Sequence, residues 1–166
     1  MTYTVPMNYS PGYPKNIGHC RMCRNNMEDL SQVLNGCLFR EGFWKYRHNS
    51  VLRCIGEQIT QYLDCTVHID VECQYAPSRD RVDLQVYVPG SKHLYLIDIK
   101  CPYDTKKNIE NSNVRNLDHY EILAVICRRA MPETTVSVHF LQVGALGTWP
   151  KRSTNILTNL KILPKV

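Results

Sequence analysis

Between residues 48 and 63 the apolar side chains recur every three or four positions, which is the spacing of one face of a helix. These residues are Val51, Leu52, Ile55, Ile59, Tyr62 and Leu63. Asn49 or Ser50 is expected to cap this helix, because a short polar side chain can accept a hydrogen bond from the first backbone N–H groups. A shorter helical pattern covers 27–36, and Gly36 is a suitable helix stop.

The pattern then changes to an alternation of apolar and polar residues, which is typical of strands. Strands are expected over 66–73, 81–88 and 93–101, and the turn at 89–92 should join the last two as a hairpin. In the second strand one face is expected to carry Val82, Leu84, Val86 and Val88, and the other Asp83, Gln85 and Tyr87.

Helical spacing returns over about 112–130, alternation over 134–143, and a last helix is expected to be capped by Ser153 or Thr154. The expected stripe of the 112–130 helix is Val114, Leu117, Tyr120, Ala124, Cys127 and Met131. From residue 50 the order is helix, three strands, helix, strand and helix, which predicts an α/β fold with a central mixed sheet flanked by helices.

The length of 166 residues suits one domain with a proper core, and the expected division is a lead-in over 1–18, a cysteine-containing segment over 19–48 and the α/β domain over 49–166. We expect no transmembrane helix and no signal peptide, because no apolar run is long enough and the first residues lack a basic-then-apolar layout. The net charge of +5 favours a polyanionic partner only weakly.

Eight cysteines without a secretory leader are expected to be metal ligands or small core residues instead of disulfides. Cys54, Cys65, Cys73, Cys101 and Cys127 lie in apolar or periodic segments, which favours core packing. The remaining three, Cys20, Cys23 and Cys37, include a C-x2-C pair that is typical of a zinc site.

Three charged residues interrupt the expected hairpin. Asp83 lies on the second strand, and Asp98 and Lys100 lie on one face of the third. Paired strands would bring both carboxylates to one Mg²⁺ ion, and the lysine could then orient water or stabilise charge on a phosphate. The alternative interpretation is a solvated strand edge, where such charges are common.

The stretch RVDLQVYVPGSKHLYLIDIKCPYD at 81–104 resembles the PD-(D/E)xK restriction-type nuclease signature. More narrowly, the chain resembles the restriction-enzyme-like endonuclease domain of site-specific non-LTR retrotransposons. That family combines a cysteine–histidine knuckle, an R-H-N tripeptide and the acidic cluster. Four stretches of this chain match its elements in order: CRMC at 20–23, RHN at 47–49, HYEIL at 119–123 and VGALGTWP at 143–150. The resemblance covers about residues 20–160.

The resemblance implies a restriction-endonuclease-like α-β-β-β-α-β core and a nuclear enzyme that nicks DNA to prime reverse transcription. Asp83 and Asp98 would hold Mg²⁺ or Mn²⁺, with Lys100 as the catalytic lysine. Candidate additional site residues are Tyr120, for which core packing is the alternative, and Glu72. Candidate DNA contacts are Arg47, His48, Lys106 and Lys107. Further expected partners are element RNA, a reverse transcriptase region outside this chain, and a second copy of the chain in a homodimer that cuts both strands.

Two positions depart from the family pattern. Val82 replaces a proline before the first acid, and Gln32 replaces the knuckle histidine. Three interpretations of the cysteine trio therefore stay open: His19 or His48 supplies a fourth ligand, water supplies it, or the knuckle holds no metal. Two alternative functions also stay open, namely a repair or recombination nuclease of the same fold and a decayed module that binds nucleic acid without cutting it.

Overall fold

The computed structural model describes residues 18–24, 27–76, 80–112 and 117–160. The chain divides into two compact units, Met1–Tyr46 and Arg47–Val166, and the boundary lies within helix α1 (Glu41–Tyr62). The tripeptide at 47–49 therefore continues a helix and does not open one. The expected lead-in over 1–18 lies outside the described residues, apart from Gly18.

The first unit contains short turns of helix around the three cysteines. His19 forms an isolated antiparallel bridge with Met27, and the single turns η1 (Gln32–Gly36) and η2 (Leu38–Arg40) follow. The helical pattern predicted over 27–36 is confirmed only from residue 30 on, and it ends at Gly36 as expected.

The second unit is built on a four-stranded mixed sheet, as the alternating pattern predicts. The strands are β1 (Thr66–Glu72), β2 (Arg81–Val88), β3 (His93–Lys100) and β4 (Thr135–Gln142), in the order β1-β2-β3-β4. The first three run antiparallel, and β4 runs parallel to β3. The turn η3 (Pro89–Ser91) closes the expected hairpin, and Lys92 ends it in the left-handed region at φ 47°.

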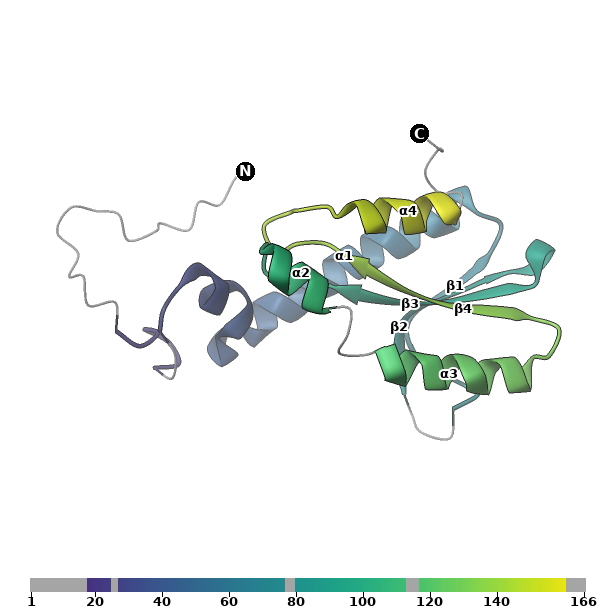
Figure 1. The fold of residues 1–166 in the computed structure, drawn as a ribbon, viewed down its shortest axis with the longest axis horizontal. Coiled ribbons are helices and arrows are strands. Elements are labelled where there is room, and N and C mark those ends of the chain that lie inside the picture. Colours follow the sequence, from purple (N-terminus) through teal and green to yellow (C-terminus); the bar gives the residue numbers. More distant parts are fainter. Residues whose placement is uncertain (1–17, 25–26, 77–79, 113–116, 161–166) are drawn as a thin grey trace. The chain divides into compact units, whose positions relative to one another are not determined.

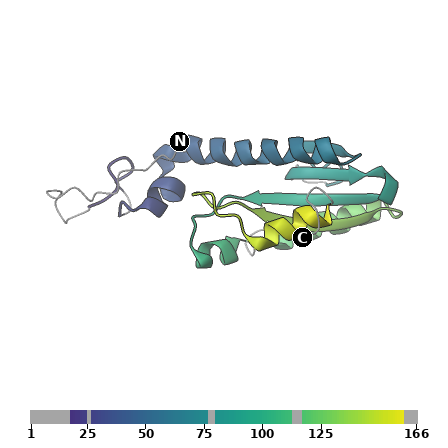
Figure 2. The same ribbon diagram turned by 90° about the horizontal axis from the view of Figure 1, so that it is seen from above.

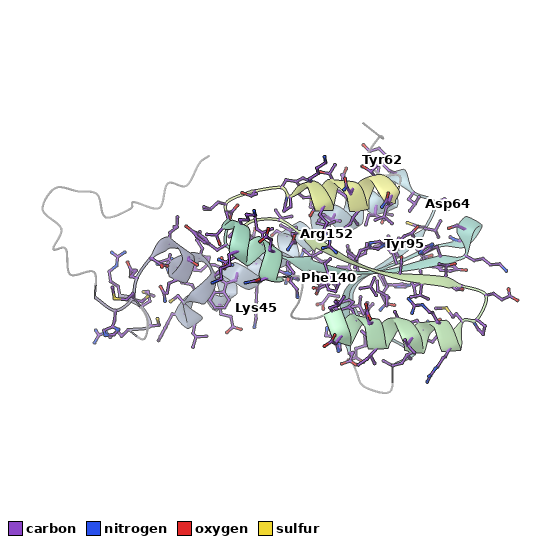
Figure 3. All side chains as sticks on the ribbon, viewed as in Figure 1. Lys45, Tyr62, Asp64, Tyr95, Phe140 and Arg152 are labelled. Atoms are coloured by element: carbon purple, nitrogen blue, oxygen red, sulfur yellow. The ribbon has the colours of Figure 1, made fainter. Side chains whose placement is uncertain are left out.

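Helices cover both faces of the sheet (Figure 1). One layer contains α1 from Arg47 on and α4 (Lys151–Asn159). Both helices cover the same face of the sheet, and Figure 2 shows them at opposite edges of it. The other layer contains α3 (Leu117–Ala130), while the short α2 (Lys106–Ser112) follows β3. Tyr95 and Phe140, labelled in Figure 3, belong to neighbouring strands and pack into opposite layers.

The expected helix starts are wrong. Asn49 and Ser50 are exposed residues within α1, because the helix already begins at Glu41 and polar side chains are tolerated on its outer face. Helix α4 begins at Lys151, directly after the extended Pro150, so Ser153 lies within the helix. The Ser153 hydroxyl is buried and donates to the Gln142 carbonyl oxygen at 2.8 Å, which ties α4 to the end of β4.

The apolar stripes also differ in detail from the expected ones. Tyr62 is 59% exposed at the last position of α1, and Leu117 is 40% exposed at the first position of α3. Val114 lies outside the described residues. Cys54 is exposed on α1, which corrects its assignment to the core, whereas Cys73 and Cys127 are buried with their sulfur atoms 3.7 Å apart. None of the described helices combines the length and hydrophobicity that crossing a bilayer requires.

Strand β2 changes its inward face at Asp83, which the regular alternation did not predict. Leu84 and Val86 pack toward α1 and α4, but Val82 packs toward α3. The facing residue of β1, Asp70, has a left-handed backbone with φ 50°, between the ladder pairs Ile69–Leu84 and Val71–Val82. This irregularity sets the position of Asp83 at the end of the β2–β3 pairing.

Candidate active site and thiol cluster

Asp98 and Lys100 form an ion pair at the end of β3, in which the acid is buried and the lysine is half-buried. The Lys100 Nζ atom lies 2.8 Å from Asp98 Oδ2, and the Asp98 side chain is only 5% exposed. Burial raises the pKa of Asp98, and the Lys100 ammonium opposes that rise. A hydrogen bond with the Tyr120 hydroxyl also opposes the rise in pKa, to a smaller extent.

Asp83 lies beside this pair. The β2–β3 ladder ends at the pair Leu84–Ile97. Asp83 therefore lies one position beyond this last pair and faces Asp98 on the neighbouring strand. There Asp83 Oδ2 accepts a hydrogen bond from the Ile99 backbone N–H at 2.7 Å, so a carboxylate replaces a backbone acceptor. The negative charge of Asp83 contributes to the raised pKa of Asp98. The structure therefore brings Asp83, Asp98 and Lys100 together.

Tyr120 of α3 contacts both acids from the opposite layer. Its side chain is 3% exposed and packs edge-on against Phe140, with ring centroids 5.7 Å apart. Burial first, and then the charges of Asp98 and Asp83, raise the pKa of its hydroxyl above the usual range, so it stays protonated. Tyr120 is thus a core residue and a neighbour of the acidic pair at the same time.

His48 of α1 supplies a positive charge to Asp83. Its Nε2 atom lies 3.4 Å from Asp83 Oδ1. Interaction with Asp83, and then with the Cys101 thiol, raises the pKa of His48 to about 10, so the imidazole is a cation at neutral pH. Cys101 was expected in the core, but it is half-buried beside His48. The sequence indicates that Cys101 lies near the site only by placing it directly after Lys100.

The other predicted residues lie outside this group. Glu72 is exposed on edge strand β1 opposite Arg81, and its charge acts on that guanidinium. Lys106 and Lys107 are exposed on α2, with Lys106 Nζ 4.0 Å from Glu110 Oε1. Arg47 is half-buried. Burial raises the pKa of Asp104, but the hydrogen bonds that this carboxylate accepts, and to a smaller extent the charge of Arg47, lower that pKa overall.

The carboxylate of Asp104 organises the loop after β4. It accepts hydrogen bonds from the backbone N–H groups of Leu146 at 2.6 Å and Thr148 at 2.9 Å. The same loop donates from Ala145 to the Pro102 carbonyl oxygen at 2.7 Å, and Val143 donates to the Lys100 carbonyl oxygen at 2.9 Å. The segment that leaves the ion pair is therefore fixed by 143–148. The sequence alone did not reveal this role of Asp104.

In the first unit the thiols of Cys20, Cys23 and Cys37 form a cluster. Their sulfur atoms all lie within 4.8 Å of one another, and no other group of three such ligands occurs among the residues that the structure describes. Hydrogen bonding, chiefly with the Cys23 backbone, lowers the pKa of Cys20 to about 7. Three thiols at this spacing could bind a metal such as zinc.

Gln32 occupies the place where a fourth ligand would be expected. Its Nε2 atom lies 3.2 Å from Cys23 Sγ, and its Oε1 atom is buried without a hydrogen-bond partner among the described residues. An amide donor can stabilise a thiolate, but it does not replace an imidazole as a zinc ligand. His48 contacts Asp83 instead, and His19 is not part of the thiol group.

The fold and these groups define an α/β protein with a buried acid–lysine site at the end of its sheet and a separate thiol cluster. Comparison with known proteins does not extend this classification. A scan against protein-family models finds no match, and a search of curated proteins finds none with significant similarity.

Proposed function

We propose that the chain is a metal-dependent DNA endonuclease domain of retrotransposon origin with a restriction-endonuclease-like core. The observation that carries the proposal is the meeting of Asp83, Asp98 and Lys100 at the ends of β2 and β3. Apart from the short α2 after β3, the order α1-β1-β2-β3-α3-β4, with β4 parallel to β3, agrees with the core that the sequence motifs imply.

The chemistry of the acidic pair fits a divalent cation. The carboxylates lie close enough that the charge of Asp83 raises the pKa of Asp98, and the Asp98 side chain is only 5% exposed. A hard cation would satisfy both features, with water and a substrate phosphate as its remaining ligands. When bound, Mg²⁺ or Mn²⁺ would lower the pKa of a ligated water and neutralise charge on the scissile phosphate.

The neighbouring side chains would complete the site. The Lys100 ammonium would orient the attacking water and stabilise negative charge that develops on the phosphate. The His48 imidazolium, 3.4 Å from Asp83, would attract a DNA phosphate to the same place. The protonated Tyr120 hydroxyl would hold the Asp98 carboxylate in position.

The remaining parts of the proposal concern the partners. A zinc ion in the thiol cluster would stabilise the first unit as a module that contacts DNA or element RNA. In this setting the nick would provide a primer for a reverse transcriptase region outside this chain, and the domain would act in the nucleus. Lys106 and Lys107, which are exposed on α2, are the candidate phosphate contacts, so binding should weaken steeply with salt.

The test is cleavage of supercoiled plasmid with and without Mg²⁺. Asp98→Asn keeps the shape of the side chain and removes the charge, so it should abolish nicking. Asp64→Asn is the matched control, because Asp64 is exposed beyond the end of α1 (Figure 3) and should cut like the unsubstituted chain. Nicking by Asp98→Asn would refute the proposed site. Salt-sensitive DNA binding by both variants without any cleavage would favour the decayed binding module.

A further inference from the structure

Helix α3 is apolar on two sides. One side carries Tyr120, Leu123, Ala124 and Cys127, which are buried against the sheet. On the other side Ile122 is 61% exposed and Val125 is 41% exposed, with the half-buried Ile126 next to them. A helix that is hydrophobic on both sides is usually covered on both. In Figure 1 this helix forms the outer layer on its face of the sheet.

The exposed side forms a continuous stripe along the helix axis. It lines a shallow depression of about 460 Å³. The lining residues are Asp118, Glu121, Ile122, Val125, Ile126 and Arg129. Their spacing of three and four residues places them on one helical face. We call this face the α3 stripe.

Charges are arranged in order along the α3 stripe. Asp118 and Glu121 lie before the apolar centre, and Arg129 lies after it. The neighbouring Arg128 is engaged elsewhere, because its Nη2 atom donates to the Val136 carbonyl oxygen at 3.0 Å. The stripe is therefore acidic, then apolar, then basic in the direction of the chain.

We propose that the α3 stripe pairs with the α3 stripe of a second copy of this chain, antiparallel and about a twofold axis at Val125. In that arrangement Glu121, four residues before the axis, faces Arg129 of the second copy, four residues after it. The two Ile122–Ile126 segments meet between these ion pairs. Such an interface is isologous, because the same surface serves both copies.

The order of charges favours this occupant over others. A parallel helix would place acid against acid, and a nucleic acid would be repelled by Asp118 and Glu121. Fourteen residues give a helix only about 21 Å long, so its contact area falls below the roughly 800 Å² per partner of stable interfaces. The dimer should therefore be weak, with a dissociation constant in the micromolar range.

Two charge reversals test the pairing. Glu121→Arg alone would place Arg against Arg in a homodimer, and Arg129→Glu alone would place Glu against Glu, so each variant should be monomeric. An equimolar mixture of the two should dimerise again, because Arg at 121 then faces Glu at 129, and Glu121 of the other chain faces Arg129. The control is Glu57→Arg, an exposed reversal on α1 that should dimerise like the unsubstituted chain.

Sedimentation velocity between about 1 and 100 μM measures the association, and circular dichroism checks that each variant is folded. The unsubstituted chain should shift from monomer to dimer within this range. Any of three results would overturn the proposal: the unsubstituted chain stays monomeric, a single reversal still dimerises, or the mixture of the two reversals stays monomeric. These outcomes involve no cleavage assay, so they are independent of the proposed nuclease activity.

Discussion

Gly144 is expected to be intolerant of alanine because of its contact with Asp104. A Cβ atom added at Gly144 would collide with Asp104 Oδ1 and would lie 2.5 Å from Asp104 Cγ. The backbone of Gly144 is outside the left-handed region, in contrast to Gly147 with φ 98°, so alanine meets no conformational strain there. On backbone grounds alone, Gly144→Ala would stabilise the fold by about 0.4–1 kcal/mol. The collision should reverse that sign.

The magnitude follows from the hydrogen bonds that the collision disrupts. To reach an ordinary contact distance the Asp104 carboxylate must move by about 1 Å or more, which breaks its bonds to the Leu146 and Thr148 N–H groups. Hydrogen bonds to charged groups contribute about 1.5–3 kcal/mol each. Water can replace part of this at a half-buried site, so we expect Gly144→Ala to lower the free energy of unfolding by about 2–3 kcal/mol.

Urea denaturation of a double-mutant cycle measures the contact directly. Asp104→Ala should lower the free energy of unfolding by a similar amount, because it removes the same two hydrogen bonds. The combined variant should lose no more than Asp104→Ala alone, which gives a coupling energy of about 2–3 kcal/mol. Gly90→Ala is the matched control, since an added Cβ there meets no atom within 4 Å and the backbone is outside the left-handed region, so it should raise the free energy of unfolding by up to about 1 kcal/mol instead of lowering it.

Additive losses in the combined variant would refute the reasoning, as would a stabilised Gly144→Ala protein. The contact also has a consequence for the candidate site. The loop at 143–148 bonds to the carbonyl oxygens of Lys100 and Pro102, so Gly144→Ala should loosen the end of β3. Any cleavage activity should therefore fall more in Gly144→Ala than in Gly90→Ala when both are measured under conditions where both are folded.

Three further predictions concern other parts of the chain. Gln32→His should tighten zinc binding by at least about tenfold, because an imidazole then completes the thiol cluster. A competition titration with a chelating dye measures the affinity, and an unchanged affinity would show that position 32 does not face the metal. Burial lowers the pKa values of His93 and His139, and the charges of His93 and then Arg152 lower the pKa of His139 further. The stability that the neutral imidazoles contribute is therefore fully present above about pH 6.5 and is lost as the pH falls through their folded pKa values. His139→Gln should flatten the dependence of urea midpoints on pH between about pH 5 and 7, and an unchanged dependence would contradict this. Gly56→Ala should change the free energy of unfolding by less than about 1 kcal/mol, because the higher helix propensity of alanine offsets the displacement of Ile69 Cδ1, which would lie 2.7 Å from the added Cβ. Ile69→Val in the same chain removes that atom and should turn the change into a net stabilisation, measured by urea denaturation.

Periodicity was a good guide to the elements of the second unit because long segments bury one side only. The three alternating stretches and the strand at 134–143 are all strands, and the stripe of Tyr120, Ala124 and Cys127 is the buried face of α3. Helix starts were harder to predict. A polar residue such as Asn49 can cap a helix or lie on its exposed side, and only the preceding residues that continue the helix decide between the two.

Cysteine shows a similar limit of sequence patterns. The expected core position holds for Cys73 and Cys127, but Cys54 is exposed and Cys101 lies beside His48. Free cysteine is usually buried, but its side chain is small enough to occupy an exposed helix position or a site beside polar groups, so position in an apolar segment does not determine burial. The thiol group of Cys20, Cys23 and Cys37 was predictable because a C-x2-C pair brings two sulfur atoms together locally.

For Asp83, the sequence predicted which residues meet in the candidate site, but it did not predict the backbone geometry that brings them together. Spacing along the chain and hairpin pairing predicted that Asp83 meets Asp98, and the structure brings them together. The alternation predicted Val82 and Leu84 on one face, whereas they pack on opposite faces of the sheet. The cause is tertiary: Asp83 accepts a hydrogen bond from the Ile99 N–H and pairs with His48 of helix α1, and the facing Asp70 has a left-handed backbone, so the regular pleat is interrupted there. A local pattern contains no information about either partner, so irregular backbone at the site is where sequence reasoning is expected to fail.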